Sequence, residues 1–331
     1  MEGINSVGIT GVGRHLPSLL VTNEDLAKNI EVTAEWIEKR TGIRSRHYAH
    51  KDDSASGFAV EAARRALKNA ELNPDSLDLI IGCTSSRDYI FPPLAAKVQY
   101  ILGANNAGAF DLTAGAAGFQ MGLTLAASHL SCKSSPAHVL LIGSALLSRY
   151  LNWADYKSSI LFGDGAGAVI LSRVPEKYGI LSSEMFCDGS VYETFRLRGG
   201  GSSFPLSESA GKKETHFIEM DGLKVGRHFL KHQPEVIERS LKKIGLSISD
   251  VDLFIFHQAN LRLLHALMDS MKIPRIKTYT NVERVGNTAD ASLAIALSEA
   301  IDEGCIKRDS VVVIAGAGPG GIYGSSVLRW F

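Results

Sequence analysis

Several features that would assign this chain to a common class are absent from its 331 residues. Its four cysteines (Cys83, Cys132, Cys187 and Cys305) form no CxxC pair, which argues against a zinc ribbon or a disulfide-stabilised scaffold. No apolar run approaches the roughly 20 residues of a membrane span. The 35 basic and 35 acidic residues give a formal net charge of zero, which does not favour nucleic acid as the main ligand. With no signal-peptide pattern either, we expect a reduced, cytoplasmic protein.

Motifs for nucleotide hydrolysis and metalloprotease chemistry are also missing. The sequence contains neither GxxxxGK[ST] nor HExxH, and no His/Cys/Asp/Glu group has a recognisable metal-ligand spacing. A glycine-rich stretch, GAGPGGIYG (316–324), follows the apolar run VVVIA, but it lies near the C-terminus and outside a first βαβ unit. We therefore expect no bound metal and no redox cofactor.

An internal repeat is the most informative large-scale feature of the sequence. Residues 66–86 align without a gap with residues 240–260, and each copy predicts a helix, a short turn and a buried strand (LDLIIGC and VDLFIFH). A second pair of buried-strand patterns, HVLLIGSA at 138–145 and SVVVIAGA at 310–317, has nearly the same separation. Generic patterning of two helix–strand units is the alternative explanation for the first pair alone.

The alternation of apolar strands with amphipathic helices predicts an α/β layered fold with buried sheets. The repeat predicts that this fold consists of two duplicated halves, residues 1–175 and residues 176–331. Duplicated α/β halves often place their site where strand ends and helix starts converge.

The stretch DLTAGAAGFQMGLTLA (111–126) predicts a strand end, a small-residue loop and a buried helix. Free N–H groups and a partial positive charge at such a helix start would ionise a thiol or hold a carbonyl oxygen. The residue at the corresponding position is Ala116, which carries no reactive group. A close-packed Ala/Gly helix start is the alternative interpretation.

Two polar residues at predicted strand and helix ends are further candidates. His257 follows an apolar strand in FIFHQANLRLL, and Asn287 begins the helix entry GNTADAS. A neutral asparagine amide can donate a hydrogen bond to a carbonyl at any working pH. A buried structural histidine and a simple helix cap are the alternatives for the two residues.

Taken together, these three segments resemble β-ketoacyl-[acyl-carrier-protein] synthase III, a thiolase-fold condensing enzyme. The resemblance covers essentially the whole chain and includes EWIEKRTGIRSRHYA (35–49), LFGDGAGAVIL (161–171), GGGSSFP (199–205), MDGLKVG (220–226) and FHQANLR (256–262). It implies a five-layered α-β-α-β-α fold and a homodimer. It also implies a ping-pong reaction, in which acyl-CoA acylates a cysteine and a malonyl-carrier protein is then decarboxylated and condensed, with coenzyme A thioesters as substrates and no cofactor.

The resemblance also implies roles for individual residues. The family's nucleophilic cysteine falls on Ala116, and His257 and Asn287 would donate hydrogen bonds to the malonyl thioester oxygen. Trp36 and Arg40 fall where the family contacts the adenine and phosphates of coenzyme A, while Gly222 and Asn260 fall along its pantetheine tunnel. Phe91 matches the aromatic residue that closes the partner's acyl pocket across the dimer, and Arg227 and Arg262 match positions that dock the acidic carrier protein.

The sequence departs from the family pattern at three places. Ala116 cannot form a thioester. A deliberate Cys→Ala change that keeps a substrate intact is one explanation, which the unspoiled surroundings favour, and a natural non-condensing homologue is the other. Pro319 has no N–H to contribute to an oxyanion hole in the loop Gly318–Pro319–Gly320, so either Gly320 donates or one donor is missing. Finally, Tyr156 stands where many relatives carry an arginine against the adenine, and the neighbouring Lys157 is expected to supply a point charge without an arginine's stacking face.

Three functions therefore remain open from the sequence. The first is the fatty-acid initiation enzyme or a relative with another acyl primer, which the His257/Asn287 pair favours. The second is a specialised-metabolism acyltransferase with a non-malonyl acceptor, which Pro319 favours. The third is a non-catalytic homologue that binds acyl-CoA or the carrier protein, which Ala116 favours.

Overall fold

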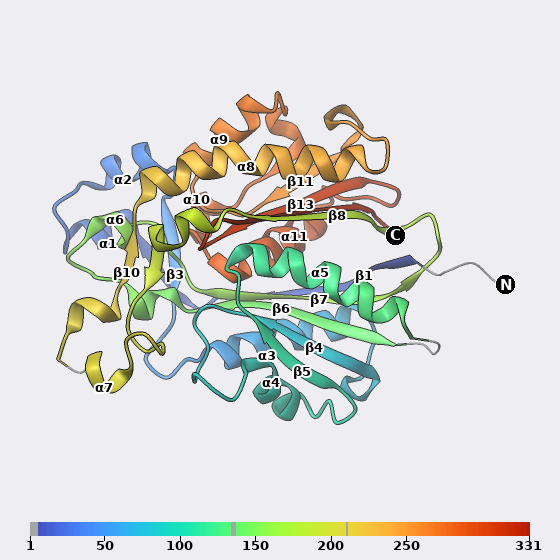
Figure 1. Ribbon diagram of the computed structural model, residues 1–331, viewed down its shortest axis with the longest axis horizontal. Helices are drawn as coiled ribbons and strands as arrows, with labels where there is room; N and C mark the ends of the chain where they lie inside the picture. The colour runs from blue at the N-terminus through green and yellow to red at the C-terminus, as the bar shows by residue number, and fades with distance from the viewer. Residues whose placement is uncertain (1–5, 134–136, 210) are drawn as a thin grey trace.

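The computed structural model describes residues 6–133, 137–209 and 211–331, and its strands form two five-stranded mixed sheets (Figure 1). Residues 1–5 and 134–136 of the predicted N-terminal half, and residue 210 of the second, lie outside the described residues. In the described part of the chain, no helix is both long and apolar enough to cross a membrane.

Both sheets have the same strand order. The first sheet runs β1 (Ser6–His15), β7 (Gly165–Val174), β6 (His138–Ala145), β4 (Leu77–Cys83), β5 (Gly108–Leu112). The second runs β8 (Gly179–Cys187), β14 (Ile322–Arg329), β13 (Val311–Gly318), β11 (Leu253–Phe256), β12 (Thr278–Tyr279). In each sheet the fourth strand of this order pairs parallel with the third and the fifth. The second strand pairs antiparallel with the first and the third.

The helices that connect the strands repeat in the same order. The first sheet is connected by α3 (Ala55–Asn69), α4 (Leu94–Leu102) and α5 (Ala116–Ser131), and the second by α8 (Gly222–Lys242), α9 (Leu261–Ser270) and α11 (Ser292–Asp302). The four strands predicted from the two repeat pairs are β4, β11, β6 and β13. The prediction of an α/β fold from two duplicated halves is therefore confirmed, while the boundary between residues 175 and 176 stays a prediction.

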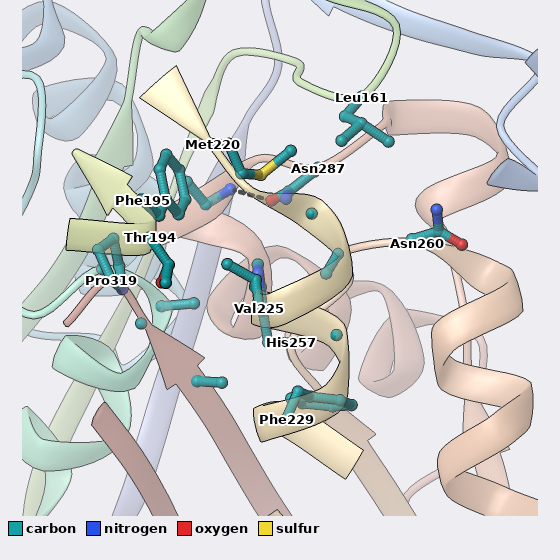
Figure 2. A pocket seen from close by; sticks show the side chains of 18 of the residues that line it. Leu161, Thr194, Phe195, Met220, Val225, Phe229, His257, Asn260, Asn287 and Pro319 are labelled. Carbon is teal, nitrogen blue, oxygen red and sulfur yellow. Dashed lines mark hydrogen bonds between the residues drawn. The ribbon is translucent and has the colours of Figure 1, made fainter. Parts of the chain in front are cut away.

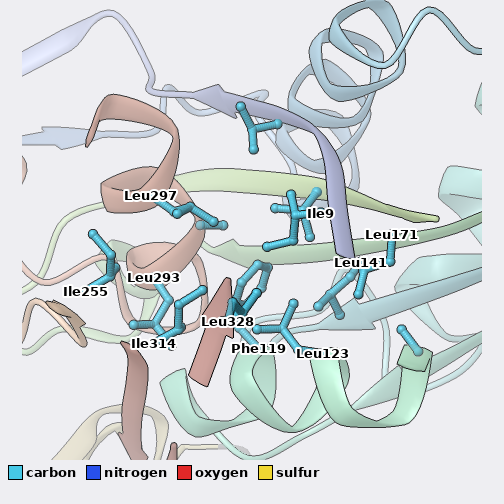
Figure 3. Packing of buried hydrophobic residues seen from close by; sticks show 14 of the residues in the cluster. Ile9, Phe119, Leu123, Leu141, Leu171, Ile255, Leu293, Leu297, Ile314 and Leu328 are labelled. Carbon is cyan, nitrogen blue, oxygen red and sulfur yellow. The ribbon is translucent and has the colours of Figure 1, made fainter. Parts of the chain in front are cut away.

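The sheets and helices form five layers (Figure 1). Helices α3 and α4 cover the outer face of the first sheet, α8 and α9 lie on the outer side of the second, and α5 and α11 pack between the two sheets. Helix α11 is buried on all sides from Ser292 to Ala300 and is apolar around most of its circumference, whereas α5 keeps one exposed side that includes Leu125 and Ser128. Phe119 and Leu123 of α5 and Leu293 and Leu297 of α11 meet both sheets in one central core (Figure 3).

Shorter elements gather at the end of the molecule where the carboxyl ends of the parallel strands lie. They comprise β2 (Leu19–Thr22), α1 (Asn23–Ala27), α2 (Ala34–Thr41), β3 (Ser45–Tyr48), α6 (Tyr156–Ser159), β9 (Phe195–Leu197), α7 (Leu206–Ser209), β10 (Ile218–Met220) and α10 (Val282–Val285). Strands β2 and β3 pair with each other, as do β9 and β10. These elements enclose the end at which strand ends and helix starts converge.

Candidate active site

A cavity of about 740 Å³ lies at this end of the sheets, and its wall brings together Ala116, His257 and Asn287 (Figure 2). Ala116 comes from α5 of the first half, whereas His257 and Asn287 come from loops of the second half. All three are largely buried, with 2 %, 9 % and 6 % of their surfaces exposed. The fold thus brings His257 and Asn287, which are 141 and 171 positions after Ala116 in the sequence, to the same cavity wall as Ala116.

Ala116 is the first residue of α5 and sits on a loop that a second loop holds in place. Gly115 caps the helix with φ 55°, a left-handed value that favours glycine, and a Cβ there would collide with the ring of Pro319. A Cβ on Gly318 would likewise collide with the carbonyl oxygen of Ala114. The two loops therefore touch backbone to backbone, and the N–H groups of the first turn of α5 are directed at the side of the cavity where Ala116 lies.

His257 directly follows β11, and its backbone N–H donates to the Ala315 carbonyl at 2.9 Å. Its Nδ1 lies 2.8 Å from the Oγ of Ser292, which also accepts from the Gln258 N–H at 2.9 Å. Burial lowers the pKa of His257 to about 4. The imidazole is therefore neutral at pH 7, and when the Ser292 hydroxyl donates to Nδ1, Nε2 carries the proton and is a hydrogen-bond donor.

Asn287 is held by its own backbone and by its side-chain oxygen. Its N–H donates to Leu161 O at 2.8 Å, its carbonyl accepts from Gly163 N–H at 3.0 Å, and its Oδ1 accepts from Ala289 N–H at 2.9 Å. Because Oδ1 is already paired, the amide Nδ2 is the group left to donate into the cavity. His257 and Asn287 thus form a pair of neutral donors in a buried site.

Asp290 is a buried carboxylate beneath this site that the sequence interpretation did not single out. It accepts hydrogen bonds from the N–H and Oγ of Ser85, which itself lines the cavity. Burial outweighs these hydrogen bonds and raises the pKa of Asp290 to about 6. At neutral pH the native state therefore holds a costly buried negative charge.

The change Asp290→Asn is expected to stabilise the protein more at pH 8 than at pH 5. The raised folded-state pKa contributes stability below the unfolded value near 3.8, and that contribution is lost as the pH rises through about 6. Between pH 5 and pH 8 the difference is on the order of 1 kcal/mol. Thermal unfolding of the variant and the parent at both pH values measures it, with the exposed Asp52→Asn as control. An equal effect at both pH values would contradict the shifted pKa.

The predicted oxyanion loop, Gly318, Pro319 and Gly320, lines the same cavity as Ala116. Pro319 lies over the Gly115 position and offers no N–H, while Gly320 has a left-handed φ of 85°. Both alternatives left open by the sequence, donation by the Gly320 N–H or a missing donor, stay predictions.

A second cavity of about 840 Å³ adjoins the first and shares Arg40, Gly222 and Asn260 with it. Its wall also contains Trp36, Tyr156 and Lys157, the other residues predicted to contact coenzyme A. The rings of Trp36 and Tyr156 meet edge to face with centroids 5.5 Å apart, and both side chains are more than one-third exposed.

The remaining predicted residues lie at or outside the cavity mouth. Asn260 caps α9 by accepting from the N–H groups of Arg262 and Leu263, so its Nδ2 is the group left to donate (Figure 2). Arg262 lines the first cavity and donates from Nε to the Lys39 carbonyl at 3.0 Å. Arg227 is exposed on α8 and lines neither cavity. Phe91 also lies outside both cavities of its own chain and is 83 % exposed.

The sequence interpretation missed two groups of residues around the cavity. One is Ser292, whose contact with His257 could have been suspected from its place in the quoted segment GNTADAS. The other is the apolar wall, for which the sequence carries no periodic signal because its members come from separate short elements: Thr194, Phe195, Met220, Val225 and Phe229 (Figure 2). This wall gives the cavity an apolar arm beside Ala116, His257 and Asn287.

Comparison with known proteins matches this chain to one family. The model for 3-oxoacyl-[acyl-carrier-protein] synthase III matches residues 110–189, and the model for the C-terminal part of that enzyme matches residues 241–330. The β-ketoacyl-[acyl-carrier-protein] synthase III of Caldanaerobacter subterraneus is 40 % identical over 98 % of each chain. That of Listeria monocytogenes is 38 % identical over 98 % of this chain and 99 % of its own.

Solved structures agree in fold over nearly the full length. The 3-oxoacyl-[acyl-carrier-protein] synthase III of Aquifex aeolicus superimposes with a TM-score of 0.90 at 36 % identity, covering 98 % of this chain and 100 % of its own. The priming β-ketosynthase of the R1128 polyketide pathway gives a TM-score of 0.91 at 32 % identity, covering 100 % and 98 %. The chain belongs to the β-ketoacyl-[acyl-carrier-protein] synthase III family of acyltransferases and has its thiolase-like fold.

Proposed function

We propose that the cavity binds an acyl or malonyl thioester with its carbonyl beside Ala116, His257 and Asn287. The observation that carries this proposal is the convergence of these three residues on one buried cavity with an apolar arm. The apolar wall around Phe195 and Phe229 suits an acyl chain, and the second cavity suits the pantetheine arm and nucleotide of coenzyme A. Trp36 and Tyr156 would contact the adenine, and Arg40 and Lys157 the phosphates.

With a cysteine at position 116, the site would support the complete condensation. The thiolate attacks the acyl-CoA carbonyl and the coenzyme A thiol leaves, so that the acyl group rests on sulfur. His257 Nε2–H and Asn287 Nδ2–H then donate to the carbonyl oxygen of a malonyl thioester, carbon dioxide leaves, and the enolate forms. The enolate carbon attacks the acyl-enzyme carbonyl, and the cysteine sulfur departs as the thiolate.

With Ala116, the same site cannot form the acyl-enzyme, because that step needs a nucleophile. The donor pair still stabilises the enolate that forms when a malonyl thioester loses carbon dioxide, and a proton then converts the enolate into an acetyl thioester. The chain as it stands is therefore a thioester-binding protein with slow decarboxylase activity. The absence of a reactive group at Ala116 also favours one other candidate, a non-catalytic homologue that binds acyl-CoA or the carrier protein.

The carrier protein would approach the cavity mouth, where Arg262 and Arg227 are exposed on neighbouring helices α9 and α8. Basic residues at a tunnel mouth steer an acidic partner even when the net charge is zero. A homodimer would account for the exposed apolar side chains of Tyr89, Ile90 and Phe91 and for the edge position of β5 in its sheet. The absence of a disulfide among the described cysteines is in keeping with a reducing cytoplasm.

Binding without covalent change tests the proposed function. Titration of the protein with acyl-CoA in a calorimeter should give one site per chain, while the intact mass of the protein stays constant because Ala116 forms no thioester. Incubation with malonyl-CoA should release carbon dioxide and leave acetyl-CoA, which chromatography detects. Binding without any acetyl-CoA would favour the non-catalytic candidate, and no binding of either thioester would contradict both candidates.

A further inference from the structure

A cluster of three potential ligands, Asp188, His228 and His232, lies beside the wall of the first cavity. Asp188 directly follows β8, whereas His228 and His232 are one turn apart on the same face of α8. The Oδ2 of Asp188 lies 3.3 Å from Nδ1 of His228 and 3.5 Å from Nε2 of His232. All three ligand atoms lie within 4.8 Å of one another. The sequence shows the two histidines at i, i+4 spacing, but Asp188 lies 40 positions before His228 and only the fold brings it to the pair.

The ring nitrogens that face Asp188 have no hydrogen-bond partner among the described residues. His228 Nδ1 and His232 Nε2 are both buried and make no hydrogen bond, and the polar atom facing them is Asp188 Oδ2 at ion-pair distance. The residue His232 is only 6 % exposed. A buried ring nitrogen without a hydrogen bond lowers the stability of the folded state, so the two nitrogens are expected to have a further partner.

The other atoms of the cluster are already engaged, which fixes what the free atoms present. Asp188 Oδ1 accepts from the N–H and Oγ of Ser190, so that Oδ2 is left to face the histidines. His232 Nδ1 lies 3.3 Å from the Oε2 of Glu235. In the neutral tautomer that donates from Nδ1 to Glu235, a lone pair on Nε2 faces Asp188. A histidine that donates to a carboxylate while its other nitrogen faces a ligand position is the usual orienting arrangement of a metal site.

We propose that Asp188, His228 and His232 bind a divalent transition-metal ion of the Zn²⁺ type. A lone pair on Nε2 that faces a carboxylate oxygen is repulsive unless a positive charge lies between them. Separate protons on the two rings would let each ring donate to Asp188 Oδ2, and this is the alternative that the titration below tests. One metal ion would instead satisfy both nitrogens and the carboxylate at once. Ligands of a tetrahedral zinc ion with bonds of about 2.1 Å are about 3.4 Å apart, close to the two carboxylate–imidazole separations.

The three-ligand set leaves a coordination position open, as in zinc sites that bind water or a substrate atom. His228 lines the first cavity, and so does Gly321, whose carbonyl accepts from the Asp188 N–H at 2.8 Å. The metal ion would therefore sit between helix α8 and the glycine-rich loop that ends beside Ala116. The proposal rests on these contacts and does not depend on the proposed reaction.

Zinc titration of untagged, chelator-treated protein tests the site, because an affinity tag of histidines would bind the ion itself. We expect one Zn²⁺ per chain by calorimetry, and Co²⁺ should give the visible absorption of a tetrahedral site. His228→Gln should abolish the binding, Glu235→Gln should weaken it about 10- to 100-fold, and the exposed His216→Gln should leave it unchanged. Unfolding temperature in the presence of chelator shows that each variant is folded.

Three outcomes would overturn the proposal. Zinc binding of equal strength in His228→Gln and in the parent would place the ion elsewhere. A sulfur-to-cobalt charge-transfer band that disappears in Cys187→Ser would assign the ion to the exposed thiol next to Asp188. Absence of binding in folded parent protein would leave a proton as the partner of these histidines. If His232→Gln proves unstable, Asp188→Asn serves as the second ligand variant, since asparagine can still cap Ser190.

Discussion

Ala116→Cys is expected to convert a protein whose mass does not change with acyl-CoA into one that gains one acyl group per chain. The new thiol would stand at the first position of α5, where the helix N-terminus lowers a thiol pKa and the free N–H groups stabilise the oxyanion. Because Ala116 lines the cavity together with His257 and Asn287, the thiolate would meet the thioester carbonyl inside a buried site. Intact-mass measurement after incubation with a panel of acyl-CoA chain lengths detects the adduct.

The native cysteines supply an internal control for this experiment. Cys132, Cys187 and Cys305 are exposed and none of them stands at the start of a helix, so peptide mapping should find the acyl group on residue 116 alone. Ala116→Ser is a matched variant with a hydroxyl that lacks the acidity of a thiol, and it should give little or no adduct. An acylated Ala116→Cys variant that forms no β-keto product with a malonyl-carrier protein would favour transfer to a non-malonyl acceptor. A folded Ala116→Cys variant that remains unacylated would refute the proposed nucleophile position.

Removing either neutral donor is the second change with a large expected effect. In the Ala116→Cys background, His257→Ala and Asn287→Ala should each slow condensation about 100- to 1,000-fold, the usual loss for one oxyanion donor. Self-acylation should be affected far less, since the N–H groups of α5 and of the glycine-rich loop act in that half-reaction. Asn287→Asp should be at least as damaging as the alanine change, because it places an anion beside the developing enolate. Rapid-quench measurement of acylation and steady-state condensation separates the two steps.

The pH dependence of decarboxylation offers an independent check on His257. Burial holds its pKa at about 4, so the imidazole is neutral across the ordinary working range. In an Asp290→Asn background, which removes the neighbouring carboxyl with a pKa of about 6, the decarboxylation rate should therefore show no inflection near pH 6.5, where an exposed histidine titrates. Ser292→Ala, which removes the partner of Nδ1, should lower the rate at every pH in this range. A profile that follows protonation near pH 6.5 in the Asp290→Asn variant would contradict a neutral donor.

Much of the architecture was predictable because the same pattern of strands and helices occurs in both halves of the sequence. The strands LDLIIGC and VDLFIFH and the pair at 138–145 and 310–317 fall on equivalent strands of the two sheets. The apolar runs of α5 and α11 identify helices buried between sheets, since such helices need no polar face. The short elements around the cavity, such as β9 and β10, have no comparable signal because three-residue strands carry too little periodicity.

The site was only partly accessible from the sequence. Strand-end and helix-start patterns pointed to Ala116, His257 and Asn287, and the structure places all three around one cavity. The sequence could not show that Ser292 lies against His257, or that burial raises the pKa of Asp290, because both depend on packing between distant segments. The apolar wall and the Asp188 cluster likewise form only when the segment after β8 meets α8.

The close contact between Gly115 and Pro319, called the clamp here, has a consequence for how this protein folds. One loop belongs to the first sheet's half and the other to the second, so the clamp needs both halves at once. Neither half alone therefore contains the complete binding site. During refolding, thioester binding would begin only when the halves dock. The onset of thioester binding would therefore report the docking of the two halves, and it would come later than the spectroscopic signals of secondary structure.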